Sequence, residues 1–430
     1  MTKGEKLLAA VGGTQVGENT KKLAESFQAK HPGVEIEFMP LQGRDHEEYF
    51  SKILAQIAAG RIPDMTTIAT EGTQLFAGQG LGYPLDDYVK RDAEAMKEYF
   101  ADVHPSLVEA MMYEGSLYTL PNDFNAANMY FNMNLLREAG LELPKEDWTK
   151  DDFYNMAKQL TKKEKQVYGY QWVNRLWGGW MPWIFVNGTN LLTEERAPGG
   201  EWLWSTFYKD DPSVKNRGGG WRWNAAKAND PANLEALEFM VQLQQEGLTP
   251  TAELGGGESV QGFFTGGQLA MTPAGGFWAG GLHNAGMKPD AFDVQYWPKW
   301  KSQRHQFGTA GWVMFEQAKN KDLVWEFMKF VNTKEAMQGF FEGNPTTPVR
   351  RSMMTAERYA TTGPKNWHVF YDTLDKFPET APIPAPPESN AMTQIFTKYT
   401  GLAVTAEQKP KDALDAMQKE LEALLAKRKK

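Results

Sequence analysis

The stretch "LLAAVGGTQVGENTKKLAESFQAKHPGVEIEFMP" (residues 7–40) decides the fold class of this chain. Its apolar start predicts a buried strand that ends in glycines. Residues 18–33 predict a helix, because Leu23 and Phe27 fall one turn apart on the same face. Residues 34–40 predict a second strand. A helix between two such strands indicates a right-handed crossover between parallel strands.

The same alternation continues beyond this stretch. Asp45 is placed to cap a second helix, with Glu48 three residues further on, and residues 64–70 predict a third strand. We therefore expect an α/β protein built on a mainly parallel sheet. Such sheets bind ligands at the carboxyl ends of their strands. The loops that this rule selects are 12–15, 41–45 and 70–73.

Composition excludes several classes of protein. At 430 residues the chain is too long for one ordinary core, so we expect two or three domains. The net charge of -8 argues against nucleic acid as a partner. The absence of cysteine excludes disulfides, thiolate metal sites and cysteine nucleophiles. There is no run of 18 apolar residues that would span a membrane.

Sequence motifs for catalysis are missing. The chain has no G-x-S-x-G elbow, no P-loop and no complete G-x-G-x-x-G. "HEEYF" (46–50) does not form a zinc-binding helix, and no calcium loop is present. We therefore expect no cofactor, no metal and no catalytic residue. With 54 Asp and Glu residues, however, an acid/base pair of the glycosidase kind stays open.

The positive signals are aromatic. "WGGWMPWIFVNGTN" (177–190) holds three tryptophans within seven residues, and eight of the 15 tryptophans fall within residues 172–223. An indole offers a flat apolar face and one N–H donor, which suits the C–H face of a sugar ring. Trp177 and Trp180 each adjoin a glycine that lets a partner approach, so we expect both to face a ligand. Trp183 is expected to begin a buried element.

The second half of the chain contains further recognisable segments. Residues 194–229 show neither helical nor strand period, so we expect a long ordered loop and a candidate roof for an extended cleft. Asp230 is placed as the N-cap of another helix. Residues 377–388 carry five prolines and predict an extended surface connection. Residues 411–430 predict an amphipathic helix docked on a domain.

Several segments in order resemble the extracellular solute-binding proteins of ATP-driven sugar importers, the maltose-binding-protein-like group (family 1). The resemblance spans nearly the whole chain, and each segment alone is weak. The segments that carry it include "ILAQIAAGRIPDM" (53–65), "LYTLPNDFNAANMYFNMNLLREAGLELP" (117–144), "FFTGGQLAMTPAGGFW" (263–278), "GTAGWVMFEQAKNKDLVWEFMKFV" (308–331) and "TPVRRS" (347–352).

This resemblance implies a two-lobed fold of the periplasmic-binding-protein type II, in which each lobe is a mainly parallel sheet flanked by helices and the ligand lies in a cleft between the lobes. It implies an N-terminal lobe of residues 1–121 and 272–313 and a C-terminal lobe of residues 122–271 and 314–430. The strand crossings between the lobes are expected near 120–123, 270–273 and 312–315.

The resemblance also implies partners and a location. The protein would capture a carbohydrate, an oligosaccharide by preference, through hinge closure and deliver it to an ABC transporter permease. We expect a monomer outside the cytoplasmic membrane, extracellular or periplasmic. Membrane association would come only through a leader or lipid anchor that this sequence lacks.

The family's cleft positions implicate one set of residues in ligand binding, contributed by the strand-end loops, the crossing segments and the aromatic stretches. They are Thr14, Gln15, Arg44, Asp45, Glu71, Asp123, Asn125, Trp177, Trp180, Trp278, Trp312 and Arg350. Helix capping is an equally good explanation for Asp45 and Glu71, and Arg350 is placed either to close the rim or to cap a helix.

Two alternatives stay open. The same fold could carry a non-sugar solute, such as a phosphodiester or a polyamine. A carbohydrate-active enzyme, a glycosidase or lyase, would instead use the tryptophans as subsites and two carboxylates about 5–10 Å apart across the cleft. The preference for a binding protein over an enzyme rests mainly on the resemblance.

Overall fold

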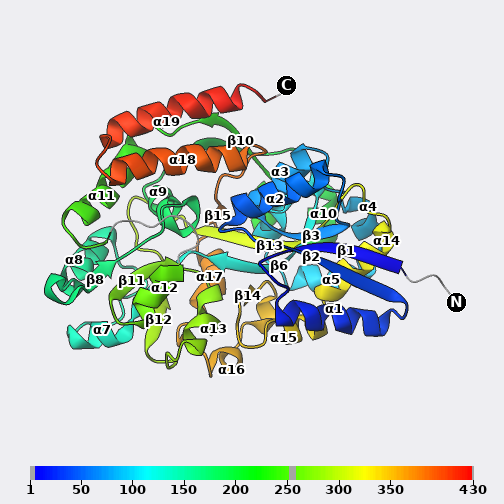
Figure 1. The fold of residues 1–430 in the computed structure, drawn as a ribbon, viewed down its shortest axis with the longest axis horizontal. Coiled ribbons are helices and arrows are strands. Elements are labelled where there is room, and N and C mark those ends of the chain that lie inside the picture. The colour runs from blue at the N-terminus through cyan, green and yellow to red at the C-terminus, as the bar shows by residue number, and fades with distance from the viewer. Residues whose placement is uncertain (1–4, 251–257, 429–430) are drawn as a thin grey trace.

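The computed structural model describes residues 5–250 and 258–428. These residues form an α/β structure with two main sheets, each covered by helices (Figure 1). We call the part built on the seven-stranded sheet the first lobe and the part built on the four-stranded sheet the second lobe.

The sheet of the first lobe is mixed. Its strands are β1 (Glu5–Gly12), β2 (Val34–Leu41), β3 (Met65–Ala69), β6 (Thr119–Ala126), β13 (Gln306–Met314), β14 (Thr347–Pro348) and β15 (Ala381–Pro382). The order is β14-β6-β13-β3-β1-β2, with β15 beside β13. β1 runs parallel to β2 and β3, whereas β13 is antiparallel to both β3 and β6. The expected mainly parallel sheet is therefore wrong beyond the first three strands, because β6 and β13 connect to the other lobe and are not joined by short βαβ units.

Helices cover this sheet and share its core. They are α1 (Glu18–Lys30), α2 (His46–Ala58), α3 (Thr70–Gly78), α4 (Asp86–Arg91), α5 (Ala93–Ala101), α6 (Pro105–Glu109), α14 (Lys321–Val331) and α15 (Lys334–Phe340). The ring of Phe27 on α1 meets Phe327 on α14 edge-on, with centroids 5.2 Å apart. A small hairpin of β4 (Met112–Tyr113) and β5 (Ser116–Leu117) precedes β6.

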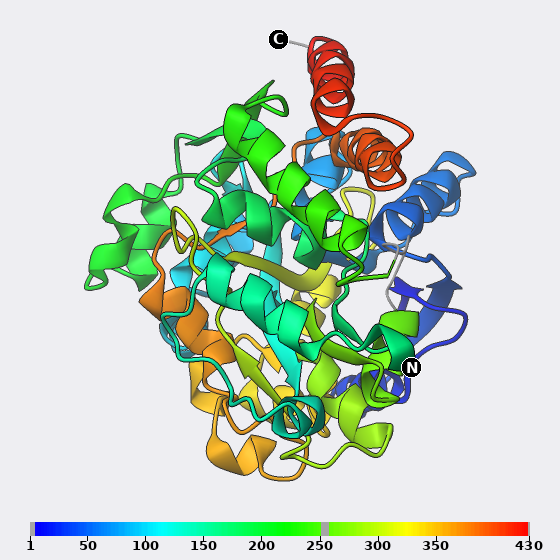
Figure 2. The ribbon, with the colours of Figure 1, turned by 90° about the vertical axis from the view of Figure 1, so that its left-hand side faces the viewer.

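The second lobe is built on β7 (Asn128–Asn132), β8 (Tyr168–Tyr170), β11 (Leu269–Ala274) and β12 (Phe292–Gln295), in the order β12-β7-β11-β8. This sheet is also mixed, since β11 is parallel to β8 and antiparallel to β7. Its helices are α7 (Met133–Glu138), α8 (Lys150–Leu160), η2 (Leu176–Trp180), α9 (Met181–Val186), α11 (Pro231–Gln245), α12 (Glu258–Thr265), α13 (Phe277–Asn284), α18 (Ser389–Val404) and α19 (Pro410–Leu425). Figure 2 shows α18 and α19 lying one above the other at the top of the molecule. Short elements complete the chain: η1 (Lys163–Lys165), η4 (Arg351–Met353), α16 (Ala356–Tyr359) and α17 (Val369–Lys376).

Residues 192–226, which we call the inserted segment, are not the long loop expected from the sequence. They form β9 (Leu192–Arg196), α10 (Glu201–Phe207), η3 (Pro212–Asn216) and β10 (Trp221–Ala226). β9 and β10 pair as an antiparallel ribbon. Each element has seven residues or fewer, which is too short to show a clear hydrophobic period.

The chain crosses between the two sheets at points that differ from those expected. The first crossing is close to expectation, because β6 ends at Ala126 and β7 of the other sheet begins at Asn128. Residues 270–273, however, lie inside β11 of the second sheet, and residues 312–314 lie inside β13 of the first sheet. A strand's own apolar pattern does not reveal which sheet it joins.

Two segments consequently lie on the other side of the expected lobe boundaries. β12 falls within the range 272–313 but pairs with β7 in the second sheet. α14 falls within the range 314–430 but packs in the core of the first lobe. The proline-rich segment 377–388 is likewise not a surface connection: Ile383 is buried in the second core, and β15 pairs with β13.

The local signals at helix ends are confirmed. The Asp45 side chain accepts a hydrogen bond from the Glu48 backbone N–H at 2.8 Å, and Asp230 accepts one from Ala232 at 2.8 Å. Both caps begin the helices that the sequence predicts, because a carboxylate satisfies an N–H that has no partner in the first turn. The C-terminal amphipathic helix is confirmed as α19, which buries Leu414.

Candidate ligand-binding site

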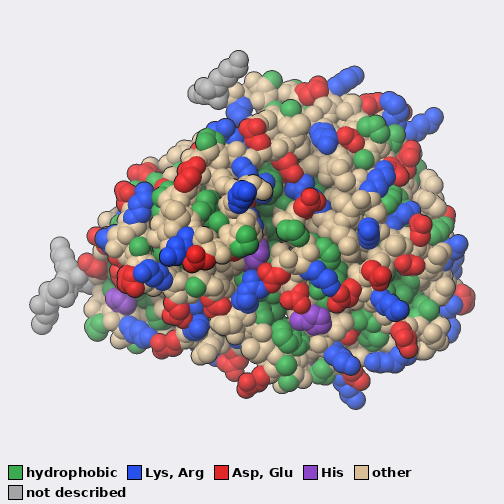
Figure 3. Space-filling model, turned by 180° about the vertical axis from the view of Figure 1, so that it is seen from behind, with side chains coloured by type: hydrophobic (Ala, Val, Ile, Leu, Met, Phe, Trp, Pro, Cys, Tyr) green, Lys and Arg blue, Asp and Glu red, His purple; other side chains and the backbone are tan. Residues whose placement is uncertain are grey.

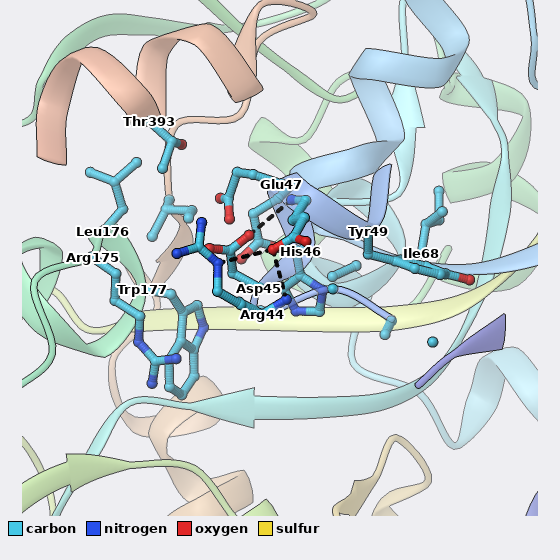
Figure 4. Close-up of a pocket in the computed structure, with 18 of the residues that line it drawn as sticks. Arg44, Asp45, His46, Glu47, Tyr49, Ile68, Arg175, Leu176, Trp177 and Thr393 are labelled. Atoms are coloured by element: carbon cyan, nitrogen blue, oxygen red, sulfur yellow. Dashed lines mark hydrogen bonds and ion pairs between the residues drawn. The ribbon is translucent and has the colours of Figure 1, made fainter. Parts of the chain in front are cut away.

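A cavity of about 850 Å³ lies between the two lobes. The first lobe contributes the N-terminal ends of α2 and α3 and parts of β6 and β13, while the second lobe contributes η2, the start of α13 and one face of α18. Figure 4 shows the labelled side chains from α2 on one side and those of η2 on the other. This volume falls within the range of about 300–1,000 Å³ that is usual for small-molecule sites.

The start of α2 forms the polar rim of the first-lobe wall. The Arg44 guanidinium Nε donates to Glu48 Oε2 at 3.0 Å, and Lys52 forms an ion pair with the same carboxylate at 3.1 Å. The hydrogen bond from the Arg44 backbone N–H, followed by those from the Arg44 guanidinium and Lys52, lowers the pKa of Glu48 to about 2. Arg44 itself is exposed. The Glu48 carboxylate at the rim is therefore shared by two cations.

Deeper in the same wall lie three carboxylates. Burial raises the pKa of Glu47, and the nearby charge of Glu71 raises it further. Burial also raises the pKa of Asp123 to about 6, although the Thr346 hydroxyl donates to its Oδ2 at 2.8 Å and opposes this shift. Glu71 accepts a hydrogen bond from Thr70 Oγ1 at 3.0 Å. Among the residues that the structure describes, no ion pair reaches the Glu47 carboxylate, and a hydrogen bond from its own backbone N–H opposes the rise in its pKa.

The second-lobe wall is formed by Arg175 and Trp177. Trp177 has extended backbone angles (φ -65°, ψ 124°) and Gly178 a positive φ of 67°, which kink the chain so that the indole turns out of the helical stack. The Gly178 N–H donates to the Gln306 side chain on β13 at 2.9 Å. The indole reaches β13 itself, since a Cβ atom at Gly308 would lie 2.9 Å from Trp177 Nε1. Trp177 thus forms a floor where the lobes meet.

Arg175 lies beside this floor, with its Cζ 5.7 Å from the centroid of the Trp177 ring. Its Nε is buried, and within the described part of the chain it meets no hydrogen-bond partner. Burial lowers the pKa of Arg175, whereas the charges of Glu47 and Glu71 across the cavity raise it. The guanidinium remains a cation, because its ordinary pKa lies far above neutrality.

This arrangement places hydrogen-bond acceptors on one wall and donors on the other. The Glu47 carboxylate accepts only, the Arg175 guanidinium donates only, and Trp177 presents an apolar ring. A solute that fits has hydroxyl groups, which both donate and accept, and an apolar face that can lie on an indole.

Six of the residues expected at the site line the cavity: Arg44, Asp45, Glu71, Asp123, Asn125 and Trp177. Thr14 and Gln15 do not line it; both are exposed, and the backbone of Gly12 and Gly13 lines the cavity instead. β1 ends at Gly12, one residue before the expected end of the strand, so the cavity is lined by the glycines at this end and not by the residues that follow.

The other expected tryptophans belong to the protein core. Trp180 is 1% exposed and packs against Trp172, Trp278 packs against Tyr130 with centroids 5.5 Å apart, and Trp312 packs against Phe327 at 5.1 Å. None of the three lines the cavity. The expectation of buried Trp183, in contrast, is confirmed, since its side chain is fully buried in α9.

The glycines beside Trp180 explain why it is buried and does not line the cavity. A Cβ atom at Gly179 would lie 2.3 Å from the carbonyl oxygen of Val173. Gly179 is therefore required for close backbone packing and not for the approach of a ligand. Gly178 is required for the kink at Trp177.

Arg350 is a structural residue. Its Nη2 donates to the Asn332 carbonyl at 2.7 Å and its Nη1 lies 3.4 Å from Asp102 Oδ2, with the side chain buried. It therefore neither closes the rim of the cavity nor lines it.

Several lining residues were not expected from the sequence. They are His46, Glu47 and Tyr49 on α2, Thr309 on β13, Phe277 on α13, and Thr393, Gln394 and Thr397 on α18. The α2 residues directly follow the predicted cap, so the strand-end rule would have found them had it been extended by one helical turn. The α18 residues carry no such signal, because the helix joins the cavity only through tertiary packing.

The inserted segment does not roof the cavity. No residue between 194 and 229 lines it. The expected roof over an extended cleft is therefore wrong.

Across the described ranges, no helix is long and apolar enough to cross a membrane. The same residues contain no group of three or more His, Asp or Glu arranged to hold a metal ion. Figure 3 shows the rear face, on which acidic and basic side chains are mixed.

Comparison with known proteins agrees with this architecture. Residues 22–363 match the family described as bacterial extracellular solute-binding protein. The maltotriose-binding protein of Pyrococcus abyssi is 26% identical over 322 residues, which cover 73% of this chain and 59% of that protein.

Two solved structures extend the likeness over the whole chain. The ABC substrate-binding protein from Listeria monocytogenes in complex with cycloalternan has a TM-score of 0.80 at 18% identity, covering 99% of this chain and 100% of the other. A solute-binding protein of an ABC transporter from Thermotoga lettingae, bound to α-D-tagatose, has a TM-score of 0.79 at 19% identity, covering 98% and 100%. The expected two-lobed binding-protein fold is thereby confirmed.

Proposed function

The chain belongs to the family of bacterial extracellular solute-binding proteins, and we propose that its solute is a neutral carbohydrate or polyol captured in the cavity between the lobes. The observation that carries this proposal is the pairing of opposite walls. Glu47 lines the cavity as an acceptor that forms no ion pair among the described residues, and Arg175 lines it as a donor whose Nε has no partner, with the Trp177 ring beside Arg175.

Hydroxyl-rich solutes satisfy both walls at once. Each hydroxyl can donate to Glu47 or Glu71 and accept from Arg175, while the C–H face of a sugar ring covers Trp177. The relatives point the same way, since their names and titles record maltotriose, cycloalternan and α-D-tagatose.

The charges in the cavity favour a solute without net charge. Arg44 is paired with Glu48, and the charges of Glu47 and Glu71 act on Arg175. A phosphodiester would meet the carboxylates of the first lobe. A polyamine would meet the Arg175 guanidinium. Both like-charge contacts are costly in a partly buried site.

We propose hinge closure as the mechanism of capture. The two walls belong to different lobes, so a solute contacts both only when the lobes are together. A ligand shifts such an equilibrium by its differential affinity for the closed state. In place of the lobe boundaries expected from sequence, we assign residues 5–126 and 306–353 to the first lobe and residues 128–303 and 389–428 to the second, with 377–388 as a crossing between them.

The proposed cellular role follows from the family. We propose that the protein works outside the cytoplasmic membrane as a monomer, releases its solute to an ABC transporter permease and carries out no catalysis. Because the cavity contains carboxylates, a glycosidase or lyase is the rival function, and analysis of the reaction products distinguishes it from a binding protein.

The test is a titration of the purified protein with a panel of mono- and oligosaccharides and polyols, in which binding is measured by tryptophan fluorescence and by isothermal titration calorimetry. Trp177→Ala is the informative variant, and Trp300→Ala is its matched control, because Trp300 is also half-buried but lies away from the cavity. We expect saturable binding of at least one sugar or polyol, a loss of about 1–3 kcal/mol in binding free energy for Trp177→Ala, and unchanged affinity for Trp300→Ala.

Chromatography of the recovered ligand completes the test. An intact sugar supports a binding protein, and a cleaved sugar makes the protein an enzyme. Binding of only phosphodiesters or polyamines would replace the carbohydrate with a charged solute. Equal affinities of the two tryptophan variants would remove Trp177 from the site.

A further inference from the structure

The inserted segment (192–226) is anchored in the second lobe by its two ends. Trp221 and Trp223 are buried in the second-lobe core. Arg428, just beyond α19, donates from Nη1 to the carbonyl of Trp223 at 2.9 Å, and Gln418 on α19 donates to the carbonyl of Ala226 at 3.0 Å. Figure 1 shows β10 next to α18 and α19.

The middle of the same segment packs on the first lobe. Phe207 at the end of α10 stacks on Phe100 of α5, with ring centroids 4.2 Å apart. The Tyr208 hydroxyl donates to the carbonyl of Val103 at 2.8 Å, and Leu203 is buried in the first-lobe core. One short stretch of chain therefore contributes to the cores of both lobes.

A buried carboxylate of the first lobe stabilises this contact through ion pairs and a hydrogen bond. Glu109 is fully buried at the end of α6, and it accepts from Arg196 Nε and Arg217 Nη1, both at 2.8 Å. The Gly218 N–H donates to the same carboxylate at 3.0 Å. A buried carboxylate is tolerated only when cations and donors satisfy it. Each of its three partners comes from the inserted segment, so detaching the segment would leave Glu109 uncompensated.

The glycines of "RGGGW" (217–221) let the backbones meet. The Gly115 N–H, in the turn of the β4–β5 hairpin, donates to the Gly219 carbonyl at 2.9 Å. A Cβ atom at Gly219 would lie 2.4 Å from Gly115 Cα, and one at Gly220 would lie 2.4 Å from the Met112 carbonyl oxygen. Any larger residue at 219 would force the segment away from the hairpin.

This connection lies apart from the ligand cavity. No part of residues 192–226 lines the cavity, and neither does Glu109 or Gly115. The lobes are therefore connected by this contact as well as by the strand crossings. It also includes an exposed ion pair in which Arg222 Nε donates to Glu114 Oε1 at 2.8 Å.

We propose that the inserted segment is a tether that holds the second lobe against the first and limits how far the cleft opens. Opening moves one lobe relative to the other, and a segment buried in both cores must either bend or detach. Detachment exposes the Phe100–Phe207 stack and breaks the Glu109 pairs, so the tether penalises wide opening. This inference goes beyond the proposed solute, because it holds for any ligand.

The test measures opening directly in the ligand-free protein. The chain has no cysteine, so Ala55→Cys on α2 and Asn155→Cys on α8 introduce one label site on each lobe. Both positions are exposed. Pulsed electron paramagnetic resonance between spin labels at these sites gives the distribution of inter-lobe distances.

Gly219→Ala is the variant that displaces the tether. Gly339→Ala is the matched control, since a Cβ atom at Gly339 meets nothing within 4 Å. We expect a narrow distribution in the parent protein and in Gly339→Ala, and a broader one shifted to longer distances in Gly219→Ala. Arg222→Ala, which removes only the exposed pair, should give a smaller shift in the same direction, with Lys398→Ala as the control for an ion pair within the second lobe.

Identical distributions in the parent and in natively folded Gly219→Ala would overturn the proposal, as would a broad distribution already present in the parent protein. Should Gly219→Ala fail to fold, Arg222→Ala decides: an unchanged distribution overturns the tether. Neither readout depends on a sugar, so the outcome is independent of the proposed function.

Discussion

Trp180 Nε1 donates a hydrogen bond to Asn174 Oδ1 at 2.7 Å beneath the floor of the cavity. The same Asn174 oxygen accepts from Thr400 Oγ1 at 2.8 Å, and its Nδ2 donates to the Thr397 carbonyl on α18 at 3.1 Å. Asn174 and Thr397 line the cavity, whereas Trp180 does not. Trp180 therefore positions the cavity wall without contacting the space inside it.

Trp180→Ala should lower the stability of the protein. The substitution empties a fully packed site and leaves a buried amide oxygen with one donor fewer, for an expected loss of about 3–5 kcal/mol in the free energy of unfolding. Urea unfolding measures this loss. A variant that unfolds like the parent protein but no longer binds ligand would instead place Trp180 at the ligand.

Gly308→Ala should weaken binding and leave the fold intact. The added Cβ would lie 2.9 Å from Trp177 Nε1, and the rigid indole must rotate to relieve this contact. Because Trp177 forms the proposed stacking floor, we expect a loss of affinity of about 1–2 kcal/mol in calorimetry, with an unchanged circular dichroism spectrum.

Gly262→Ala is the control for this experiment, as a Cβ atom there has open space. Undiminished affinity in Gly308→Ala would show that the indole does not need its present position to hold the solute.

Asp123 should make the stability of the protein depend on pH. Burial raises its pKa to about 6 in the folded protein, while an unfolded aspartate titrates near about 3.9. At pH values between these two pKa values, the folded state therefore keeps a proton on Asp123 that the unfolded state has already released. The free energy of unfolding should fall as the pH rises from about 4 to about 6 and change no further through this group above that.

Asp123→Asn removes this titration and keeps an oxygen that can accept from Thr346 Oγ1. Relative to the parent protein, the variant should gain stability across that window, by roughly 1–2 kcal/mol after allowance for partial exposure. Thermal unfolding of both proteins from pH 4 to pH 7 measures the difference, with Asp210→Asn at an exposed position as the control. A constant difference across the range would contradict the raised pKa.

The local parts of this fold could be predicted from sequence because their causes are local. Asp45 caps α2 and Asp230 caps α11 through side-chain contacts within three residues. The strand-end loops also place Arg44, Asp45 and Glu71 at the cavity, since parallel strands bring their carboxyl ends to one edge.

What the sequence could not supply depends on contacts between distant segments. Trp177 and Trp180 are both tryptophans next to a glycine, yet Trp177 lines the cavity and Trp180 is buried. The difference arises because the Val173 carbonyl leaves room only for a glycine at 179. The need for glycine at 219 and 220 likewise has no local cause, because their backbones pack against Gly115 and Met112 of the first lobe.

Arg175→Met should abolish most of the ligand affinity, and Arg44→Met should change it little. Both arginines line the cavity. Arg44 is exposed and already paired with Glu48, so a ligand gains little from it. The Arg175 guanidinium has no ion pair among the described residues and a buried Nε without a partner, so its donors are available to a ligand. Methionine keeps an unbranched, flexible side chain, although a shorter one, and removes every donor. We expect Arg175→Met to lose about 2–3 kcal/mol of binding free energy, as for hydrogen bonds to a charged group. Calorimetric titration of both variants with the same sugar gives the comparison. Equal losses in the two would mean that the ligand is held at the rim of α2 and not against the second-lobe wall.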